Sequence, residues 1–295
     1  MYKALGDAIR DAEASGKTLS AVALEAESVD QGRSVDEIRS VLQRALAVMR
    51  GAVERGMPGD LRSASGLVGG DAAKLRKGGG PDGPLADTPF RDILARALAV
   101  QEVNAAMGVI VAAPTAGGAG VLPAVLTGLA SARGLSDSSV VDALATAGLI
   151  GAVVAERASL SGAEGGCQAE TGAAAGMAAG AATEMLGGTP SQAGQAVSLT
   201  MQGMLGLVCD PLGGLVELPC VFRNATGAAI ALAGIEMALA GITFAIPVDE
   251  VIDVMGEIGR NMDVRYRETA GGGLAATPTG RRLARERLVQ LKRSP

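Results

Sequence analysis

Most of the large side chains that usually fill a protein core are missing from this sequence. Its 295 residues include two Tyr, three Phe and no Trp, whereas Gly occurs 43 times, roughly twice its usual share. The glycines follow no three-residue repeat, so a collagen-like fibre is excluded. A core of Ala, Gly, Val and Leu fills space only where elements approach closely, which helices with small-residue faces do most easily. With no alternating strand pattern, the sequence predicts one compact all-α domain over residues 1–295.

The expected helices are separated by loops that are unusually rich in Gly and Pro. Ser34 and Glu37 form a capping-box pattern, and the helix that follows ends at Gly56. The stretch 62–89 is predicted to be a Gly/Pro-rich loop region. The remaining expectations are a helix over 90–113, a turn over 114–123, helices to about 159, a Gly-rich turn over 160–172, and helices over 173–186, 190–207 and 224–245.

The net charge and the absence of histidine exclude several classes of function. The chain has no His, which excludes Ser-His-Asp and Cys-His catalysis, His-ligated zinc and His general bases within it. The net charge of −5 argues against nucleic acid as the main partner. Residues 281–295 are locally basic and are interpreted as a C-terminal helix or tail, solvated rather than an interaction arm.

One long uncharged stretch raises the question of a membrane protein. Residues 103–132 carry no charge and are long enough to span a bilayer, but Pro114 and Pro123 interrupt them. Aromatic belts at the two membrane interfaces are ruled out by the lack of Trp and the scarcity of Tyr. The N-terminal residues lack the apolar stretch of a signal peptide. We therefore expect a cytoplasmic protein without a membrane association.

The three cysteines are the strongest chemical signal. Cys167, Cys209 and Cys220 are an odd number with no CxxC spacing, which argues against disulfides and a zinc knuckle. By residue type alone, a Cys is usually a small buried hydrophobe. Here, however, each is flanked by Gly or Pro and is expected in a turn rather than on a helix core face. Three converging thiolates suit an iron–sulfur cluster with one open iron; zinc in a Cys₃ site is the alternative metal.

At this point the sequence resembles the iron–sulfur-dependent L-serine dehydratases, specifically the alpha chain of their two-chain form. The resemblance covers nearly the whole chain, and six motifs stand in the family's order with all three cysteines matched. These are Ser65–Lys74 (SGLVGGDAAK), Ala113–Gly117 (APTAG) with Gly120–Pro123 (GVLP), Glu164–Glu170 (EGGCQAE), Cys209–Pro211 (CDP) with Gly214–Cys220 (GLVELPC), Arg223–Asn224, and Glu268–Ala270 (ETA) with Gly272–Ala275 (GGLA).

The resemblance implies conversion of L-serine to pyruvate and ammonia. It implies a [4Fe–4S] cluster on Cys167, Cys209 and Cys220, whose open iron acts on the substrate hydroxyl. No pyridoxal phosphate is expected, because that cofactor needs a Schiff-base Lys in an α/β fold. A separate beta chain, whose region in relatives carries a Ser-Ser-His-Thr motif, would supply a histidine, and a higher oligomer is expected. The alpha chain alone is therefore predicted to be poorly active or inactive.

Two departures from the family pattern change these expectations. The turn after APTAG usually carries Ser or Cys, whereas this chain has Gly118 and Ala119 there, so no side chain at that point is assigned to substrate. Some single-chain relatives place a C-terminal cysteine on the open iron. This sequence ends Lys-Arg-Ser-Pro, and inhibition by its own tail is not expected. The regulatory beta domain of the single-chain form is likewise not expected.

The remaining site residues are hypotheses drawn from the same motifs. Lys74 and Asp71 are the candidate catalytic residues, with Glu164 as a further candidate base. The candidate substrate-binding residues are Ser63, Ser65, Asn104, Thr115 and Gly117. Backbone N–H groups around 115–120 and 165–166 could bind the substrate carboxylate or the cluster sulfurs.

Two other functions stay open on the sequence. The same cluster chemistry could act on cysteine or threonine, or the chain could be a non-enzymatic helical subunit with core cysteines. Comparing serine, threonine and cysteine as substrates separates these activities from serine deamination. Iron and sulfide content shows whether the chain is a non-enzymatic subunit.

Overall fold

In the computed structural model of the chain, which describes residues 2–78 and 88–291, several helices begin at a residue whose side chain caps them. The predicted capping box of Ser34 and Glu37 starts α3 (Val35–Gly56), and a second box of Thr189 and Gln192 starts α10 (Pro190–Met201). Each Ser or Thr side chain accepts a bond from a backbone N–H that has no partner within the helix.

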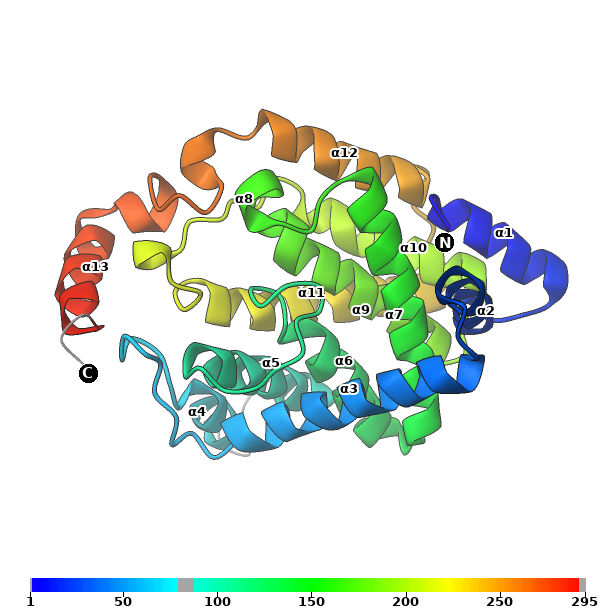
Figure 1. Cartoon of the computed structure of the whole chain (residues 1–295), viewed down its shortest axis with the longest axis horizontal. Helices are drawn as coiled ribbons and strands as arrows, with labels where there is room; N and C mark the ends of the chain where they lie inside the picture. The colour runs from blue at the N-terminus through cyan, green and yellow to red at the C-terminus, as the bar shows by residue number, and fades with distance from the viewer. Residues whose placement is uncertain (1, 79–87, 292–295) are drawn as a thin grey trace.

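The described residues form thirteen α-helices and no strand, which confirms the all-α prediction (Figure 1). Besides α3 and α10 they are α1 (Leu5–Ser15), α2 (Leu19–Gln31), α4 (Asp71–Lys77), α5 (Pro89–Ala105), α6 (Val121–Arg133), α7 (Asp137–Arg157), α8 (Gly162–Gly165), α9 (Ala173–Met185), α11 (Cys220–Leu239), α12 (Val248–Asn261) and α13 (Pro278–Leu291).

The helix α9 is the centre of the domain. Every residue from Ala173 to Thr183 is buried, and α6, α7, α10 and α11 pack around it (Figure 1). Its small residues make this close packing possible. A Cβ added at Gly180 would lie 2.5 Å from Ile150 Cδ1 on α7 and 2.8 Å from Val197 Cγ2 on α10. No aromatic side chain is among the buried core residues, as the composition predicts.

Several element boundaries differ from the sequence prediction. The helix expected over 90–113 ends at Ala105, and the one expected from Asn224 begins at Cys220. The predicted loop region 62–89 contains α4, because Glu102 binds the backbone N–H groups at the start of that helix; the part of it over 79–87 lies outside the described residues. α12 was not anticipated. The basic segment 281–295 is helical as far as Leu291 in α13, and the rest of it lies outside the described residues.

One described helix is long and apolar enough to cross a membrane. It is α7, and 67% of its most apolar window is buried inside the protein. The core helix of a globular domain passes the same test of length and composition. The uncharged run 103–132 is not such a helix, because it is divided between α5, a fifteen-residue connection and α6.

Candidate active site

The three cysteines lie at the ends of helices and in a loop, all of them buried. Cys167 precedes a π-helical turn, η1 (Gln168–Gly172), which runs directly into α9. Cys209 lies in the connection between α10 and α11 and pairs with Arg267 in an isolated bridge. Cys220 is the first residue of α11 and Cys167 is also helical, so the expectation of a turn was wrong for these two residues. The side chains are 2%, 2% and 5% exposed, and all three thiols are free.

Electrostatic coupling shows that the three thiols share one region. Burial, followed by the charge of Cys167, raises the pKa of Cys220 to about 12. Burial raises the pKa of Cys209 far above its usual range, and Cys167, Glu170 and Cys220 each raise it further. Among the described residues no three His, Cys, Asp or Glu side chains are grouped to hold a single metal ion. The cysteine ligands of an iron–sulfur cluster stand further apart than those of a single ion, because the iron–sulfur core lies between them. The finding therefore argues against a zinc ion and says nothing about a cluster.

A buried carboxylate that the sequence analysis missed lies among these thiols. Glu170 is 8% exposed, and its Oε2 is 3.8 Å from Cys209 Sγ. Thr115 Oγ1 donates to Glu170 Oε1 at 2.7 Å. Burial raises the pKa of Glu170, while the Thr115 bond partly opposes that effect. One signal could have revealed it: a lone acidic residue at the entry to the Ala-rich buried helix α9, where an unpaired charge is costly.

Two glycines make room for the Glu170 carboxylate. A Cβ added at Gly117 would lie 2.8 Å from either oxygen of Glu170, and one at Gly162 would lie 2.6 Å from Oε2. Real side-chain carbons do not approach so closely, so a side chain at either position would displace the Glu170 carboxylate from where it lies. The predicted site residues Thr115 and Gly117 therefore both contact Glu170.

The loop that carries Thr115 and Gly117 presents free backbone donors. The N–H groups of residues 115–118 have no hydrogen-bond partner within the part of the chain described here. Asn224 on α11 holds the loop, because its Nδ2 donates to Gly117 O at 2.7 Å and its Oδ1 accepts from Gly120 N at 2.9 Å. By contrast, the N–H groups of Gly165 and Gly166 donate to Ser161 and Gly162 carbonyls and are not free donors.

Arg223 connects the loops that carry two of the cysteines. It lies one turn beyond Cys220 on α11, and its Nη1 contacts both Val208 O and Asp210 Oδ1 at 2.8 Å. Asp210 follows Cys209, and its Oδ2 accepts from Leu274 N at 2.6 Å. The guanidinium also opposes the rise in the pKa of Cys167 and Cys220 that burial causes. Arg223 and Asp210 belong to motifs noted in the sequence, but their mutual contact was not foreseen.

Ser63 and Ser65 hold a loop rather than present free hydroxyls. Ser65 donates through Oγ to Glu217 and through its N–H to the same carboxylate, and Ser63 Oγ accepts from Val68 N at 3.2 Å. Glu217 lies three residues before Cys220, so Ser65 joins the SGLVGGD loop to the cysteine-bearing loop. Asn104 Nδ2 is 3.4 Å from Ala116 O, so the Asn104 side chain lies next to the 115–118 loop.

The candidate bases lie at the surface. The Lys74 ammonium is 75% exposed and pairs with Asp71 at 2.8 Å on α4. Glu164 is exposed and accepts from Ser159 Oγ at 2.6 Å. In the described structure none of these three side chains contacts a cysteine or Glu170, so their catalytic role stays a prediction.

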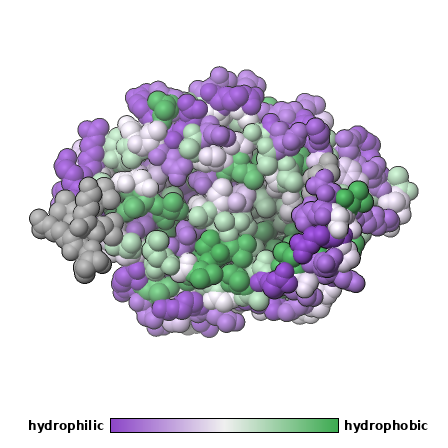
Figure 2. All heavy atoms as spheres, in the orientation of Figure 1, coloured by the Kyte–Doolittle hydropathy of each residue, from purple (hydrophilic) through white to green (hydrophobic). Residues whose placement is uncertain are grey.

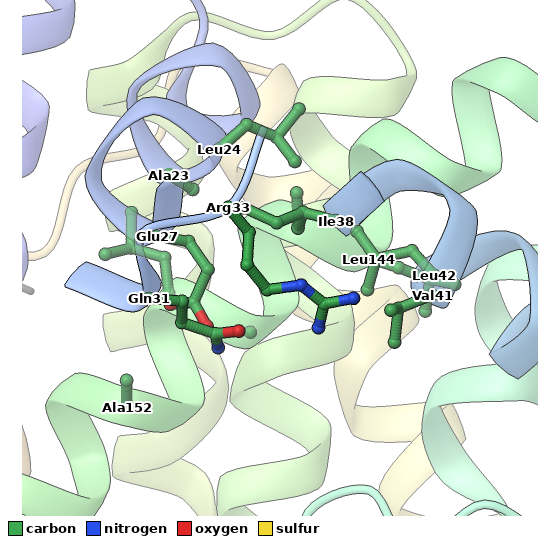
Figure 3. Close-up of a pocket in the computed structure, with 13 residues that line it drawn as sticks. Ala23, Leu24, Glu27, Gln31, Arg33, Ile38, Val41, Leu42, Leu144 and Ala152 are labelled. Carbon is green, nitrogen blue, oxygen red and sulfur yellow. The ribbon is translucent and has the colours of Figure 1, made fainter. Parts of the chain in front are cut away.

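A separate apolar pocket lies away from the cysteines. It has a volume of about 310 Å³ between α2, α3 and α7, and its lining contains no Cys. Figure 3 shows Arg33 extending across it, with Glu27 and Gln31 to one side and Leu42 and Leu144 to the other. It contributes nothing to the site built around Glu170.

Comparison with known proteins gives the family of the chain. Residues 14–275 match the family model for the serine dehydratase alpha chain. The chain is 47% identical to the probable L-serine dehydratase, alpha chain, of Bacillus subtilis, over 86% of this chain and 84% of that one. It is 39% identical to the L-serine dehydratase, alpha chain, of Peptoniphilus asaccharolyticus, over 90% and 91%.

A third relative is longer than this chain. The chain is 43% identical to the L-serine dehydratase of Streptomyces coelicolor over 90% of its own length, but the match covers 59% of that relative. The breadth of the family match and the coverage of both alpha chains lead to one conclusion. The chain belongs to the serine dehydratase alpha chain family.

Proposed function

We propose that this chain is the catalytic subunit of an L-serine dehydratase, a lyase that converts L-serine to pyruvate and ammonia in the cytoplasm. The observation that supports the proposal is the set of three buried free thiols, one of which, Cys209, lies 3.8 Å from the buried carboxylate of Glu170. The names of the alpha-chain relatives support the choice of serine as substrate, and the three unpaired cysteines suit a reducing compartment.

The donor set fits an iron–sulfur cluster. Cys167, Cys209 and Cys220 are thiols without partners in one buried region, and Arg223 lies close enough to lower the pKa of two of them. A nearby cation offsets the negative charge of thiolate ligands, which must lose their protons to bind a metal. These three residues would hold a [4Fe–4S] cluster, which when bound supplies a Lewis-acidic iron for the substrate hydroxyl.

The chain's own groups can bind both ends of an amino acid. The free N–H groups of residues 115–118 would bind the substrate carboxylate, as consecutive backbone donors bind anions elsewhere. The carboxylate of Glu170, which packs against Gly117 of the same loop, would accept the substrate ammonium. Thr115 fixes the orientation of Glu170 by donating to Oε1, leaving Oε2 to face the cysteine region.

The reaction removes the Cα proton and the Cβ hydroxyl of serine, which leave together as water. The resulting aminoacrylate tautomerises to an imine, and water hydrolyses the imine to pyruvate and ammonia. Proton removal needs a base, and this sequence contains no histidine. We propose that a beta chain brings a histidine to the open side of the site and forms a heteromer with this chain.

The test is to reconstitute the purified chain with iron and sulfide under anaerobic conditions and to measure pyruvate from L-serine with and without the beta chain. We expect bound iron and sulfide in both samples and rapid turnover only in the mixture. Full turnover by this chain alone would refute the two-chain active site, and faster turnover of L-cysteine or L-threonine would refute the choice of serine. Absence of bound iron and sulfide would refute the cluster.

A further inference from the structure

An exposed apolar segment leads directly into the loop that binds Glu170. We call residues 106–112, between the end of α5 and Ala113, the 106–112 segment. Met107 is 84% exposed and Val109 is 76% exposed, whereas the core around them buries residues of the same kind. Met107 also has a positive φ of 61°, a conformation that non-glycine residues adopt at a cost. The positive φ belongs to the end of α5, where Gly108 N donates to Val103 O. On either side of Gly108, Met107 and Val109 both expose apolar side chains, as surfaces that bind a partner do.

The segment lies outside regular secondary structure and leaves backbone donors unpaired. Residues 108–112 contain no helix, turn or bend. The N–H groups of residues 109–112 donate to nothing within the described structure. One side is packed, because Ile110 contacts the cluster of Ala52, Val53 and Val100. Val111 packs against the main core as well, so Val109 is the exposed valine of the segment. An apolar stretch outside regular structure, with an exposed valine and unpaired backbone donors, can accept a strand from another chain.

The position of the segment connects it to the site. It continues into Pro114 and the free N–H groups of residues 115–118. Phe222, on the first turn of α11, is a further exposed apolar residue, with 44% of its surface accessible. Asn224 of the same helix binds the loop through Gly117 O. Figure 2 shows hydrophobic residues gathered in the lower middle of the face turned to the viewer, over the region where Figure 1 draws the connection from α5 to α6.

We infer that the 106–112 segment is the docking strand for the beta chain, which adds an apolar edge strand along it and closes the site. The inference rests on the proposed function. A beta chain is chosen over a second copy of this chain for two reasons. About two fifths of the S. coelicolor relative lies outside the match and must find a surface near this catalytic region. A partner on this segment would also reach the site that needs a base.

The first test measures binding of the purified beta chain to three forms of this chain by calorimetry. We expect Val109→Lys to weaken binding at least tenfold, because a charge is buried against an apolar strand. The matched control is Val29→Lys on α2, at a residue that is 85% exposed, and it should bind like the original. Thermal unfolding of each variant alone should be unchanged. Equal binding by Val109→Lys would overturn the proposal.

The second test separates strand pairing from simple apolar contact. Hydrogen exchange should slow at the amides of residues 109–112 when the beta chain is added, and Val109→Pro should weaken binding more than Val109→Ala because it removes a donor. Protection elsewhere without protection here would refute strand addition. Loss of self-association of this chain, with beta-chain binding intact, would assign the segment to a second copy instead.

The two proposals fail in different ways. If the two chains bind through this segment but produce no pyruvate, the docking stands and the proposed function is wrong. If they produce pyruvate and Val109→Lys changes neither binding nor turnover, the function stands and the docking is wrong.

Discussion

At the residue scale, the site depends on how Glu170 is held. Its carboxylate is nearly sealed from solvent, accepts one bond from Thr115 and lies against two glycines that leave space for it. Burial disfavours its charge and raises its pKa. A bound ammonium would stabilise the ionised carboxylate, because an opposite charge within a few ångströms offsets part of the desolvation cost. Glu170 is thus prepared for a cationic ligand group.

Replacing Glu170 by Gln should therefore damage substrate use more than the fold. A charge-assisted hydrogen bond contributes about 1.5–3 kcal/mol, so we expect kcat/KM for L-serine to fall about 10- to 150-fold in the reconstituted two-chain enzyme. Iron and sulfide content should stay unchanged. The matched control is Glu25→Gln, at an exposed residue paired with Lys17, which should keep full activity. A variant at Glu170 that loses its iron would show a structural role instead.

At the scale of elements, small residues determine how closely the helices pack. Gly56 at the end of α3 lies so close to α5 that an added Cβ would be 2.1 Å from Ala99 O. Gly234 on α11 approaches Thr200 on α10 in the same way, with Oγ1 at 2.0 Å from an added Cβ. Gly51 also lies on α3 but faces solvent, with nothing within 4 Å of an added Cβ. An added Cβ is therefore sterically blocked at Gly56 and free of contacts at Gly51, although both glycines lie on one helix.

Gly56→Ala and Gly51→Ala should change stability in opposite directions. We expect Gly56→Ala to lower the free energy of unfolding by about 1–3 kcal/mol, because the backbone of α5 must move. Gly51→Ala should raise it by about 0.5–1 kcal/mol, because Ala loses less entropy than Gly in a helix. Urea unfolding of this chain alone measures both. Equal effects would show that α3 and α5 do not pack as closely as described.

At the scale of the whole molecule, the cysteines come from two separate parts of the chain, the entry to α9 and the stretch that leads into α11. Cys167 comes from the entry to α9, Cys220 from the start of α11, and Cys209 from the connection between α10 and α11. Arg223 and Asp210 link the last two, and Leu274 ties in the segment before α13. A partner chain on the 106–112 segment would close the remaining side.

Oxygen should therefore attack the reconstituted subunit alone faster than the two-chain complex. We expect the visible absorption of the cluster and the released iron to change several-fold more slowly when the beta chain is bound, since a covered cluster is shielded from oxygen. Activity regained by adding the beta chain after exposure should fall in step with the absorption. Equal decay rates for the free subunit and the complex would show that the partner does not cover this region.

The sequence by itself determined the class of fold and the family. Five aromatic residues and 43 glycines leave only close helix packing to build a core, and α9 packs in that way. The Gly- and Pro-flanked cysteines and the ordered motifs identified the family that the comparison confirmed. These features are local, so they can be read along the chain.

Which side chains meet was decided only by the tertiary structure. The bond from Thr115 to Glu170 joins residues 55 apart, and that from Ser65 to Glu217 joins residues 152 apart. Ser65, a predicted substrate contact, bonds to Glu217 in the folded chain, and Glu170, which the sequence analysis overlooked, lies beside Cys209. Burial and partners belong to the packed helices rather than to any one segment, because a polar group is satisfied by whichever element folding brings beside it.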